Sequence, residues 1–120
     1  MAEAISEQRV SAWIEKYVHA WRTYDEQDIA ALFTDDAEYH ELPYATSWIG
    51  REQIVAGWLD RADWQSGGWE FEWSVLGISG DTAAIGGTGV YRKLGTFSNL
   101  WTVTLDDDRC AVFRMWNNEI

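Results

Sequence analysis

The sequence predicts an α+β fold, with a cone-shaped, curved, mixed or antiparallel sheet wrapped around three N-terminal helices. Apolar residues recur at helical spacing through most of the first half of the chain, and from Trp69 onward they alternate with polar residues, as in strands with one wet face. The 120 residues suffice for one core, since folding a chain of this length buries about two thirds of its surface. A sheet that buries one face against only three helices will curl around them. We therefore expect a single domain over residues 1–120, shaped as a cone with one open end.

The helices are predicted from apolar spacing and from capping residues. Ser6 is an N-cap residue, and apolar side chains then recur every three or four positions over residues 10–24. Asp25 is expected to cap a second, short helix, which ends where Thr34 and two aspartates break the pattern. The third helix is predicted over residues 51–64.

The strands are predicted from alternation and from turn residues. A short strand at residues 37–42 precedes a loop at residues 43–50, and alternation then marks a strand that begins at Trp69. Three further strands are predicted at residues 82–93, 96–105 and 109–116. Because the last four strands follow one another across short turns, we expect them to form a meander.

Composition excludes several classes of partner and location. Nine Lys and Arg against twenty Asp and Glu give a net charge of −11, which repels nucleic-acid phosphates and anionic membrane surfaces. A single cysteine excludes an internal disulfide framework and fits a reducing cytoplasm. No apolar run reaches the roughly 20 residues that cross a bilayer, and residues 1–6 lack the features of a signal peptide. We expect a soluble, cytoplasmic protein with no nucleic-acid or membrane partner.

The sequence offers little that would hold a metal or a cofactor. A metal site of the zinc type needs three or four converging ligands, and both histidines, His19 and His40, are expected to point outward. The one thiol, Cys110, is expected to be a small buried side chain. We therefore expect neither a metal nor a cofactor.

Aromatic residues are the unusual feature, with nine Trp, five Tyr and four Phe. Such side chains line a dense core, a subunit interface or a pocket, because each carries a large apolar area. Glycine is rare inside strands, yet Gly86, Gly87 and Gly89 occur together in one predicted strand. If Tyr91 faces inward, so do Gly87 and Gly89, whose missing side chains leave a hollow on the inner face. The hollow is either a cavity for a flat, mostly apolar ligand or a space that one of the tryptophans fills.

The last predicted strand is apolar on both faces. Phe113 and Met115 alternate with Val112 and Trp116, so the outer side of this strand is expected to be covered as well. A second copy of the chain is the simplest cover.

Four stretches resemble the nuclear transport factor 2-like superfamily, in particular its SnoaL-like, or polyketide-cyclase-like, branch. They are KYVHAW, DIAALFTDDAEY, IGREQI and the closing GTFSNLWTVTLDDDRCAVFRMW. The resemblance implies the cone fold, a pocket between the first helix and the concave face of the sheet, and homodimers that pair through the outer face. It leaves the chemistry open, because this superfamily includes steroid isomerases, dehydratases, epoxide hydrolases, polyketide cyclases and proteins without catalysis.

The resemblance also implies candidate catalytic residues. Tyr17 falls where ketosteroid isomerases place the tyrosine that donates to the substrate oxygen, and Glu41 falls where they place their carboxylate base. Desolvation in an aromatic pocket would raise the pKa of Glu41 toward neutrality, as proton abstraction next to a carbonyl requires. Trp101 stands in place of the acidic donor of those enzymes, which argues against steroid isomerisation. Asn99 is the other candidate donor, and the inner face has no match for the Asp, Arg, Asp relay of epoxide hydrolases.

Taken together, the sequence favours a protein that binds a small, mostly apolar or aromatic molecule, with catalysis unproven. Alternation places Tyr39 and Glu41 on the inner face and His40 on the outer face. The expected pocket residues are Trp21, Tyr39, Trp58, Gly87, Gly89, Tyr91, Trp101, Phe113 and Met115. One alternative is a cofactor-independent lyase, isomerase, cyclase or dehydratase that uses Glu41 as general base and Tyr17 or Asn99 as hydrogen-bond donor. Another is a structural homodimer without a ligand.

Overall fold

The computed structural model describes residues 5–42, 46–60, 68–92 and 95–119 of the chain. Within these residues the helices come first and most of the strands follow. The elements, in chain order, are α1 (Glu7–Thr23), α2 (Glu26–Ala30), β1 (Phe33–Leu42), β2 (Thr46–Ile49), α3 (Arg51–Leu59), β3 (Trp69–Ser79), β4 (Thr82–Tyr91), β5 (Gly95–Asp106) and β6 (Arg109–Glu119).

Both predicted helix caps are confirmed. The Ser6 side chain accepts a hydrogen bond of 3.1 Å from a backbone N–H of the first turn of α1. This helix ends at Tyr24, whose backbone is left-handed with a φ of 50°. The Asp25 carboxylate accepts from the N–H groups of Gln27 and Asp28, at 2.8 and 3.1 Å. The chain therefore leaves α1 and enters α2 within two residues.

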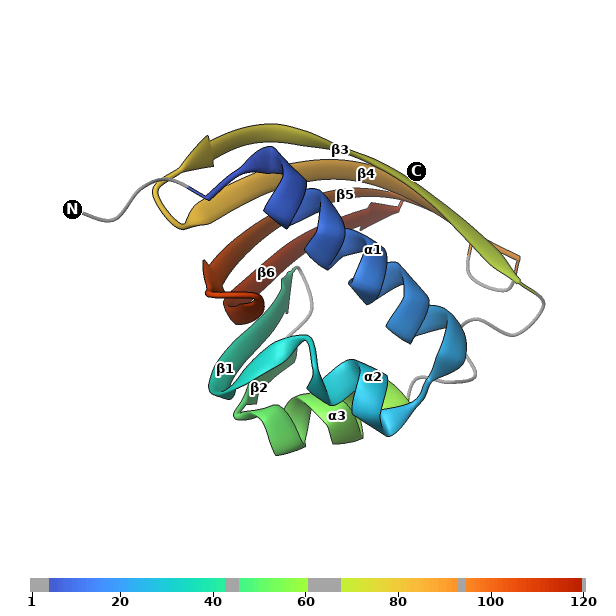
Figure 1. Cartoon of the computed structure of the whole chain (residues 1–120). Helices are drawn as coiled ribbons and strands as arrows, with labels where there is room; N and C mark the ends of the chain where they lie inside the picture. Colours follow the sequence, from blue (N-terminus) through green and yellow to red (C-terminus); the bar gives the residue numbers. More distant parts are fainter. Residues whose placement is uncertain (1–4, 43–45, 61–67, 93–94, 120) are drawn as a thin grey trace.

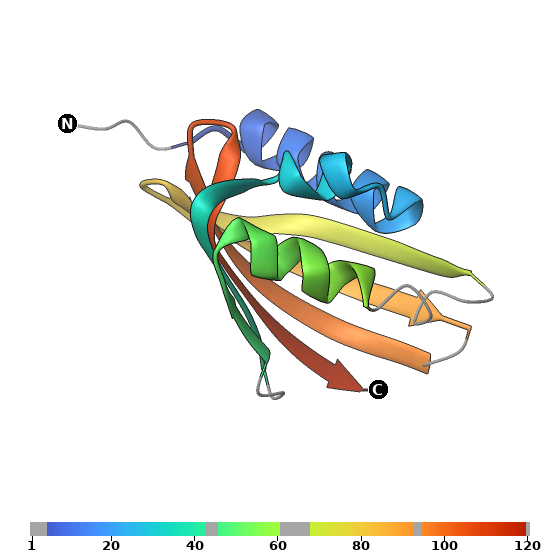
Figure 2. The same ribbon diagram turned by 90° about the horizontal axis from the view of Figure 1, so that it is seen from below.

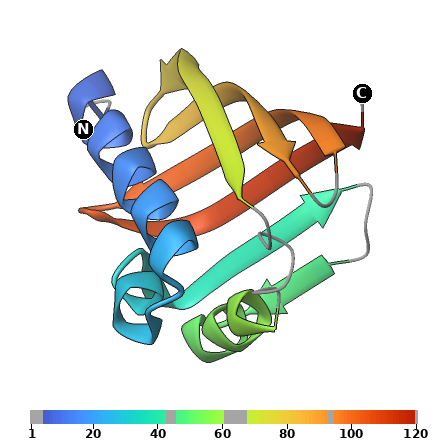
Figure 3. The same cartoon turned by 90° about the vertical axis from the view of Figure 1, so that its right-hand side faces the viewer.

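The described strands form one curved sheet in the order β2-β1-β6-β5-β4-β3. Neighbouring strands are antiparallel except for β1 and β6, which run parallel. Figure 1 shows β3 to β6 arching over α1, with α2 and α3 beside β1 and β2. The parallel pair makes the sheet mixed. The edge strands β2 and β3 do not pair with each other, so the sheet is unclosed (Figure 3). The fold is of the predicted α+β class.

The core lies between the helices and the concave face of the sheet. Trp13, Ile14 and Tyr17 of α1 are buried, as are Ile54 and Trp58 of α3. Figure 2 shows α3 lying close to α2 on the same side of the sheet as α1. None of the described helices is both long and apolar enough to cross a lipid bilayer.

Alternation along β1 follows the prediction. Tyr39 and Glu41 are only 1% and 4% exposed, whereas His40 between them lies on the outer face and is half-buried. The strand itself is longer than expected. It begins at Phe33 and includes the exposed Asp35. Between Phe33 and Glu38 the register with β6 shifts, so this stretch does not show regular alternation.

The expected loop at residues 43–50 is wrong in part, because Thr46–Ile49 form strand β2. A four-residue edge strand shows too little alternation to be distinguished from a loop. Residues 43–45 lie outside the described residues. The third helix ends at Leu59 with Asp60 as its C-cap, and residues 61–64 of its predicted span lie outside the described residues. Residue 93 of the predicted third strand also lies outside them.

Candidate functional site

Tyr17 is the centre of the aromatic cluster that the sequence predicts. Its ring centroid lies 4.7 Å from Trp101, 4.8 Å from Trp58 and 5.4 Å from Phe113. These contacts join α1 to α3 and to two strands of the sheet. The structure therefore brings together four of the residues named from the sequence.

A column of stacked rings runs from α1 across the sheet. Tyr17 stacks on Phe113, Phe113 on Tyr39, and Tyr39 on Trp48, with interplanar angles of 15°, 14° and 21°. The hydroxyl groups of Tyr17 and Tyr39 are 3.2 Å apart in a buried hydrogen bond. Neighbouring strands and one helix are thus held by ring contacts in which the predicted donor, Tyr17, takes part.

Glu41 is buried on the inner face beside this column. Its backbone is in register with Met115 of β6, and Met115 is in register with Trp101 of β5. These three side chains therefore follow one row across the concave face. A buried carboxylate is costly to keep in a protein interior, which makes Glu41 the described charged residue most suited to chemistry.

Asn99 lies in the next row of β5 and bonds within its own strand. Its side-chain oxygen accepts from the Trp101 indole N–H at 3.4 Å, and its amide nitrogen donates to the Phe97 carbonyl at 3.4 Å. Trp101 is thus linked to each of the three catalytic candidates, Tyr17, Asn99 and Glu41. It contacts the ring of Tyr17, bonds Asn99, and lies in the row of Glu41.

The hollow over Gly87 and Gly89 is occupied by Phe71, a residue that the sequence interpretation did not assign to the pocket. A β-carbon on Gly87 would lie 2.5 Å from the Phe71 ring and 2.9 Å from the Glu72 carbonyl oxygen. The Phe71 ring is stacked on Trp101, at 5.0 Å and 10°. The expectation of an open hollow, or of one filled by tryptophan, is therefore wrong, because Phe71 lies opposite Gly89 and leans across both glycines.

Two buried indole donors in the cluster have no acceptor. Among the described side chains, the Nε1 atoms of Trp21 and Trp58 are buried without a hydrogen-bond partner. Their rings contact edge to face at 5.2 Å. By contrast, the indole N–H of Trp13 donates to the Leu32 carbonyl at 3.0 Å. An unsatisfied buried donor costs about 1–3 kcal/mol, so this pair of indoles is the place in the cluster where the described residues leave hydrogen-bonding capacity unused.

The aromatic cluster continues at the C-terminal end of α1, where Trp21 lies. Trp21 contacts Trp69 at 6.4 Å, and Trp69 stacks on Tyr91 at 6.1 Å. The Arg22 guanidinium lies 4.5 Å above the Trp69 ring. Tyr91 is thus placed with Trp69, at a distance from Glu41 along the sheet.

Residues missed by the sequence interpretation differ in how visible they were. Trp69 and Phe71 lie on the inner face of a strand whose alternation was recognised, so a count of inward aromatic residues would have included them. Trp48 lies in the segment expected to be a loop, and nothing in the local pattern points to it.

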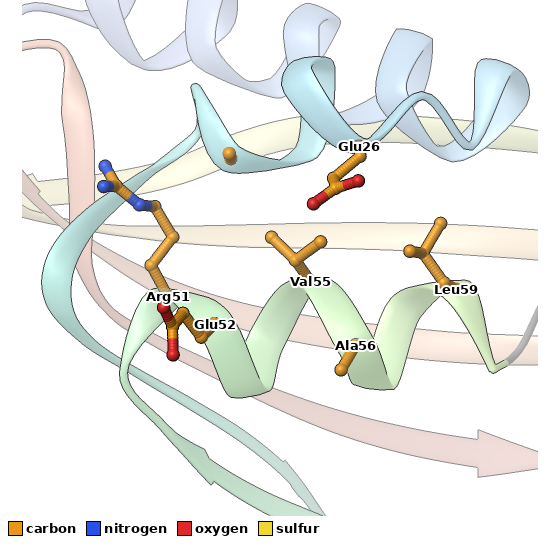
Figure 4. A pocket seen from close by; sticks show the side chains of 7 residues that line it. Glu26, Arg51, Glu52, Val55, Ala56 and Leu59 are labelled. Atoms are coloured by element: carbon orange, nitrogen blue, oxygen red, sulfur yellow. The ribbon is translucent and has the colours of Figure 1, made fainter.

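A separate groove of about 370 Å³ lies between α2 and α3. Figure 4 shows Glu26 from α2 and Val55 and Leu59 from α3 pointing into it. Arg51 at its rim is paired with Asp35 at 2.6 Å. The groove lies outside the aromatic cluster.

No metal site is evident elsewhere in the part of the chain that the structure describes. It contains no group of three or more His, Cys, Asp and Glu side chains placed to hold a metal.

The outer face of the sheet carries an apolar row. In register across four strands are Leu42, Trp116, Leu100 and Gly86, and the missing side chain of Gly86 is overlain by Leu76. Leu42, Leu76 and Leu100 are exposed. The row crosses the sheet from β1 to β3 on the face opposite the aromatic cluster.

A curved, unclosed sheet packed against N-terminal helices is the fold of many solved structures. A protein of unknown function with a cystatin-like fold from Methylobium petroleophilum PM1 is 18% identical, with a TM-score of 0.75 over 96% of this chain and 79% of that one. A putative ketosteroid isomerase from Kribbella flavida DSM 17836 is 15% identical, with a TM-score of 0.67 over 94% and 80%. An M. tuberculosis LEH-like epoxide hydrolase is 16% identical, with a TM-score of 0.66 over 92% and 84%. At these identities the likeness concerns the fold alone.

The family model of the SnoaL-like domain matches residues 14–120. The chain therefore belongs to the SnoaL-like domain family, within the nuclear transport factor 2-like superfamily that the sequence resembles. None of the curated proteins compared with the sequence matches it.

Proposed function

We propose that this SnoaL-like domain binds a small, mostly apolar molecule that carries one hydrogen-bond acceptor. The observation that carries the proposal is the pair of buried indole donors on Trp21 and Trp58. An acceptor oxygen on a ligand would recover the free energy that these donors lose on burial. The surrounding rings supply the apolar walls that a flat ligand needs.

A matched pair of ligands tests this proposal. Fluorenone and fluorene have the same three-ring shape, but only fluorenone carries a carbonyl. Titration followed by tryptophan emission is expected to give fluorenone about fivefold tighter binding, the effect of one net hydrogen bond of about 1 kcal/mol. Equal affinities, or unchanged emission with both ligands, would contradict the proposal.

Two variants identify the donors. Trp21→Phe removes one of the two unpartnered donors and is expected to reduce the preference for the ketone. Trp101→Phe removes an indole whose N–H already bonds Asn99, and should retain the preference. A preference lost equally in both variants would point to a general loosening of the cluster.

The burial of Glu41 favours a second candidate function, proton abstraction next to a carbonyl. In this proposal Glu41 is the general base, and Tyr17 or Asn99 donates to the carbonyl oxygen of the substrate. Exchange of the α-protons of a cyclic ketone for deuterium, followed by NMR, measures the reaction without knowledge of the natural substrate. Glu41→Gln keeps the side-chain size and should abolish exchange above the buffer rate, whereas exchange that persists in this variant would remove Glu41 from the mechanism.

The apolar row on the outer face supports a homodimer, which we propose as the assembly of this chain. Exposed leucines in a continuous row lose contact with water when a second copy covers them. A dimer without any ligand is the remaining alternative if both ligand tests fail. The cytoplasmic location expected from the sequence stays a prediction.

A further inference from the structure

We propose that Ser47, His40 and Glu38 form a second site, on the outer face of the hairpin β1–β2, in which Ser47 is a base-activated nucleophile toward small activated esters. The Ser47 hydroxyl lies 3.1 Å from His40 Nδ1, and His40 Nε2 lies 3.1 Å from a Glu38 carboxylate oxygen. A nucleophile, a base and a group that orients the base are therefore in hydrogen-bond contact in the order that acyl transfer requires. We call these three residues the Ser47 relay.

Strand register explains why the three side chains meet. Glu38 and His40 are two residues apart on β1 and so share its outer face. Ser47 of β2 lies directly opposite His40. The Ile49 N–H donates to the Gln53 side chain instead of to β1, so by alternation Ser47 and His40 form a non-hydrogen-bonded pair, the kind in which side chains approach most closely.

Proton positions in the relay follow from the chemistry of the three groups. An ionised carboxylate only accepts, so a neutral imidazole beside Glu38 carries its proton on Nε2. Nδ1 then has a free lone pair and accepts from the Ser47 hydroxyl. This is the arrangement in which a histidine can take the serine proton during attack.

The relay is open to small molecules and includes a candidate donor for the oxyanion. Ser47 is exposed, and the side chains of His40 and Glu38 are 25% and 45% exposed. Because the Ser47 backbone N–H has the same orientation as that of Ile49, it points to the side of β2 away from β1. A nucleophile's own N–H is one of the donors that stabilise the oxyanion in acyl transfer.

The proposed reaction is ordinary acyl transfer. Ser47 Oγ bonds to the ester carbonyl carbon while the hydroxyl proton passes to His40 Nδ1. The tetrahedral intermediate then expels the alcohol or phenol, which takes the proton from the imidazolium, and the acyl group remains on Ser47. Water attacks the acyl-serine with His40 again as base, releasing the acid and restoring the serine hydroxyl.

The test compares Ser47 with another exposed serine of the same chain. Ser98 lies on β5, opposite Thr88 of β4 and in register with Asn118 of β6, with no histidine in either position. The native protein is treated with p-nitrophenyl acetate or with a fluorophosphonate, and the modified serines are quantified by mass spectrometry. Ser47 is expected to react at least tenfold faster than Ser98, less than the roughly 10²–10⁴-fold that a general base usually contributes, because the site is exposed.

Variants separate a reactive relay from three side chains that only join two strands. His40→Gln should lower Ser47 labelling to the rate of Ser98, and Glu38→Gln should lower it by a smaller factor, while circular dichroism shows each variant folded. Labelling is repeated in Leu100→Glu, so that a second copy on the outer face cannot conceal Ser47. Equal labelling of Ser47 and Ser98 in both backgrounds, or a Ser47 rate that His40→Gln leaves unchanged, overturns the proposal.

Discussion

At the scale of single residues, the contact between Phe71 and Gly87 sets the shape of the inner face. The ring lies where any larger residue at position 87 would place its β-carbon, and it is held there by its stack on Trp101. Gly87 therefore admits an aromatic ring close to the backbone, whereas a β-carbon on Gly89 would meet that ring at an ordinary 3.7 Å. The missing side chain at position 87 serves the packing of the protein itself.

Gly87→Ala is expected to lower the free energy of unfolding by about 1–3 kcal/mol, the usual cost of overpacking a core. Neither the stacked Phe71 ring nor the Glu72 carbonyl can retreat freely from the added methyl group. Gly77→Ala is the control, because a β-carbon there meets nothing within 4 Å. Urea unfolding of both variants gives the comparison, and equal midpoints would show that the Phe71 contact is not tight.

Cys110 is fully buried, and burial raises the pKa of its thiol far above the ordinary value. The unfolded chain loses this proton above about pH 8.5, whereas the folded chain keeps it. Rising pH therefore favours the unfolded state, by about 1.4 kcal/mol for each pH unit above that point. Stability measured by urea unfolding from pH 8 to 10 should fall more steeply in the wild type than in Cys110→Ala; parallel slopes would contradict this assignment.

Residue patterns predicted the direction of side chains well and their neighbours poorly. Alternation placed Tyr39 and Glu41 inward and His40 outward, as the structure confirms. It could not identify Phe71 as the occupant over the glycines, because an absent side chain does not say which residue fills its space. The hydrogen bond between His40 and Ser47 was equally invisible, since Ser47 lies on β2, a strand that the sequence did not reveal.

At the scale of secondary-structure elements, α3 and β2 approach each other closely at Gly57. A β-carbon on Gly57 would overlap the Trp48 indole, which lies against the helix backbone at this point. Trp48 also stacks on Tyr39, so it cannot move aside without disturbing the ring column. The glycine inside this helix is therefore required by the hairpin that precedes it.

Gly57→Ala separates helix propensity from packing. Alanine favours the helix by up to about 1 kcal/mol, whereas overlap with Trp48 costs about 1–3 kcal/mol, so the variant is expected to be less stable than the wild type. In a Trp48→Leu background the overlap disappears and the same substitution should stabilise. A thermodynamic cycle from urea unfolding measures both, and the same sign in both backgrounds would mean that Trp48 does not limit this position.

Elements with strong periodicity or clear caps were predictable, and the short ones were not. α1 and α2 begin at the predicted residues because Ser6 and Asp25 bond the first backbone N–H groups. β2 was missed because its four residues carry no repeating pattern. The stretch of β1 around Asp35 was missed because Asp35 and Asp36 are both exposed, so the sequence does not alternate there. The register with β6 shifts in the same stretch.

At the scale of the whole molecule, the apolar row gives the homodimer proposal a direct test. Leu100→Glu places a charge in the row and should convert a dimer to a monomer in sedimentation velocity at micromolar concentration. Leu59→Glu is the matched control, since Leu59 on α3 is 38% exposed against 40% for Leu100 but lies outside the row. A monomeric wild-type chain, or an equal effect of both substitutions, would contradict pairing through this face.

Fold class could be predicted from the sequence because helices and strands differ in period, and because the described part of the chain has three helices to cover the sheet. The order of strands could not be, because periodicity carries no information about which strands pair. The expected meander is correct for β3 to β6, but β6 continues the sheet into β1 by parallel pairing. The aromatic cluster followed from composition, whereas its two unpartnered donors required coordinates.

The parallel seam between β1 and β6 has a kinetic consequence. Tyr39 is in register with Phe113, so contacts that complete the sheet span most of the chain and close a long loop. Domains dominated by such distant contacts have high contact order and fold slowly, because chain entropy is lost before the contacts repay it. Folding of this chain is therefore expected to wait for its first and last strands to find each other, with the β3–β6 meander able to assemble earlier.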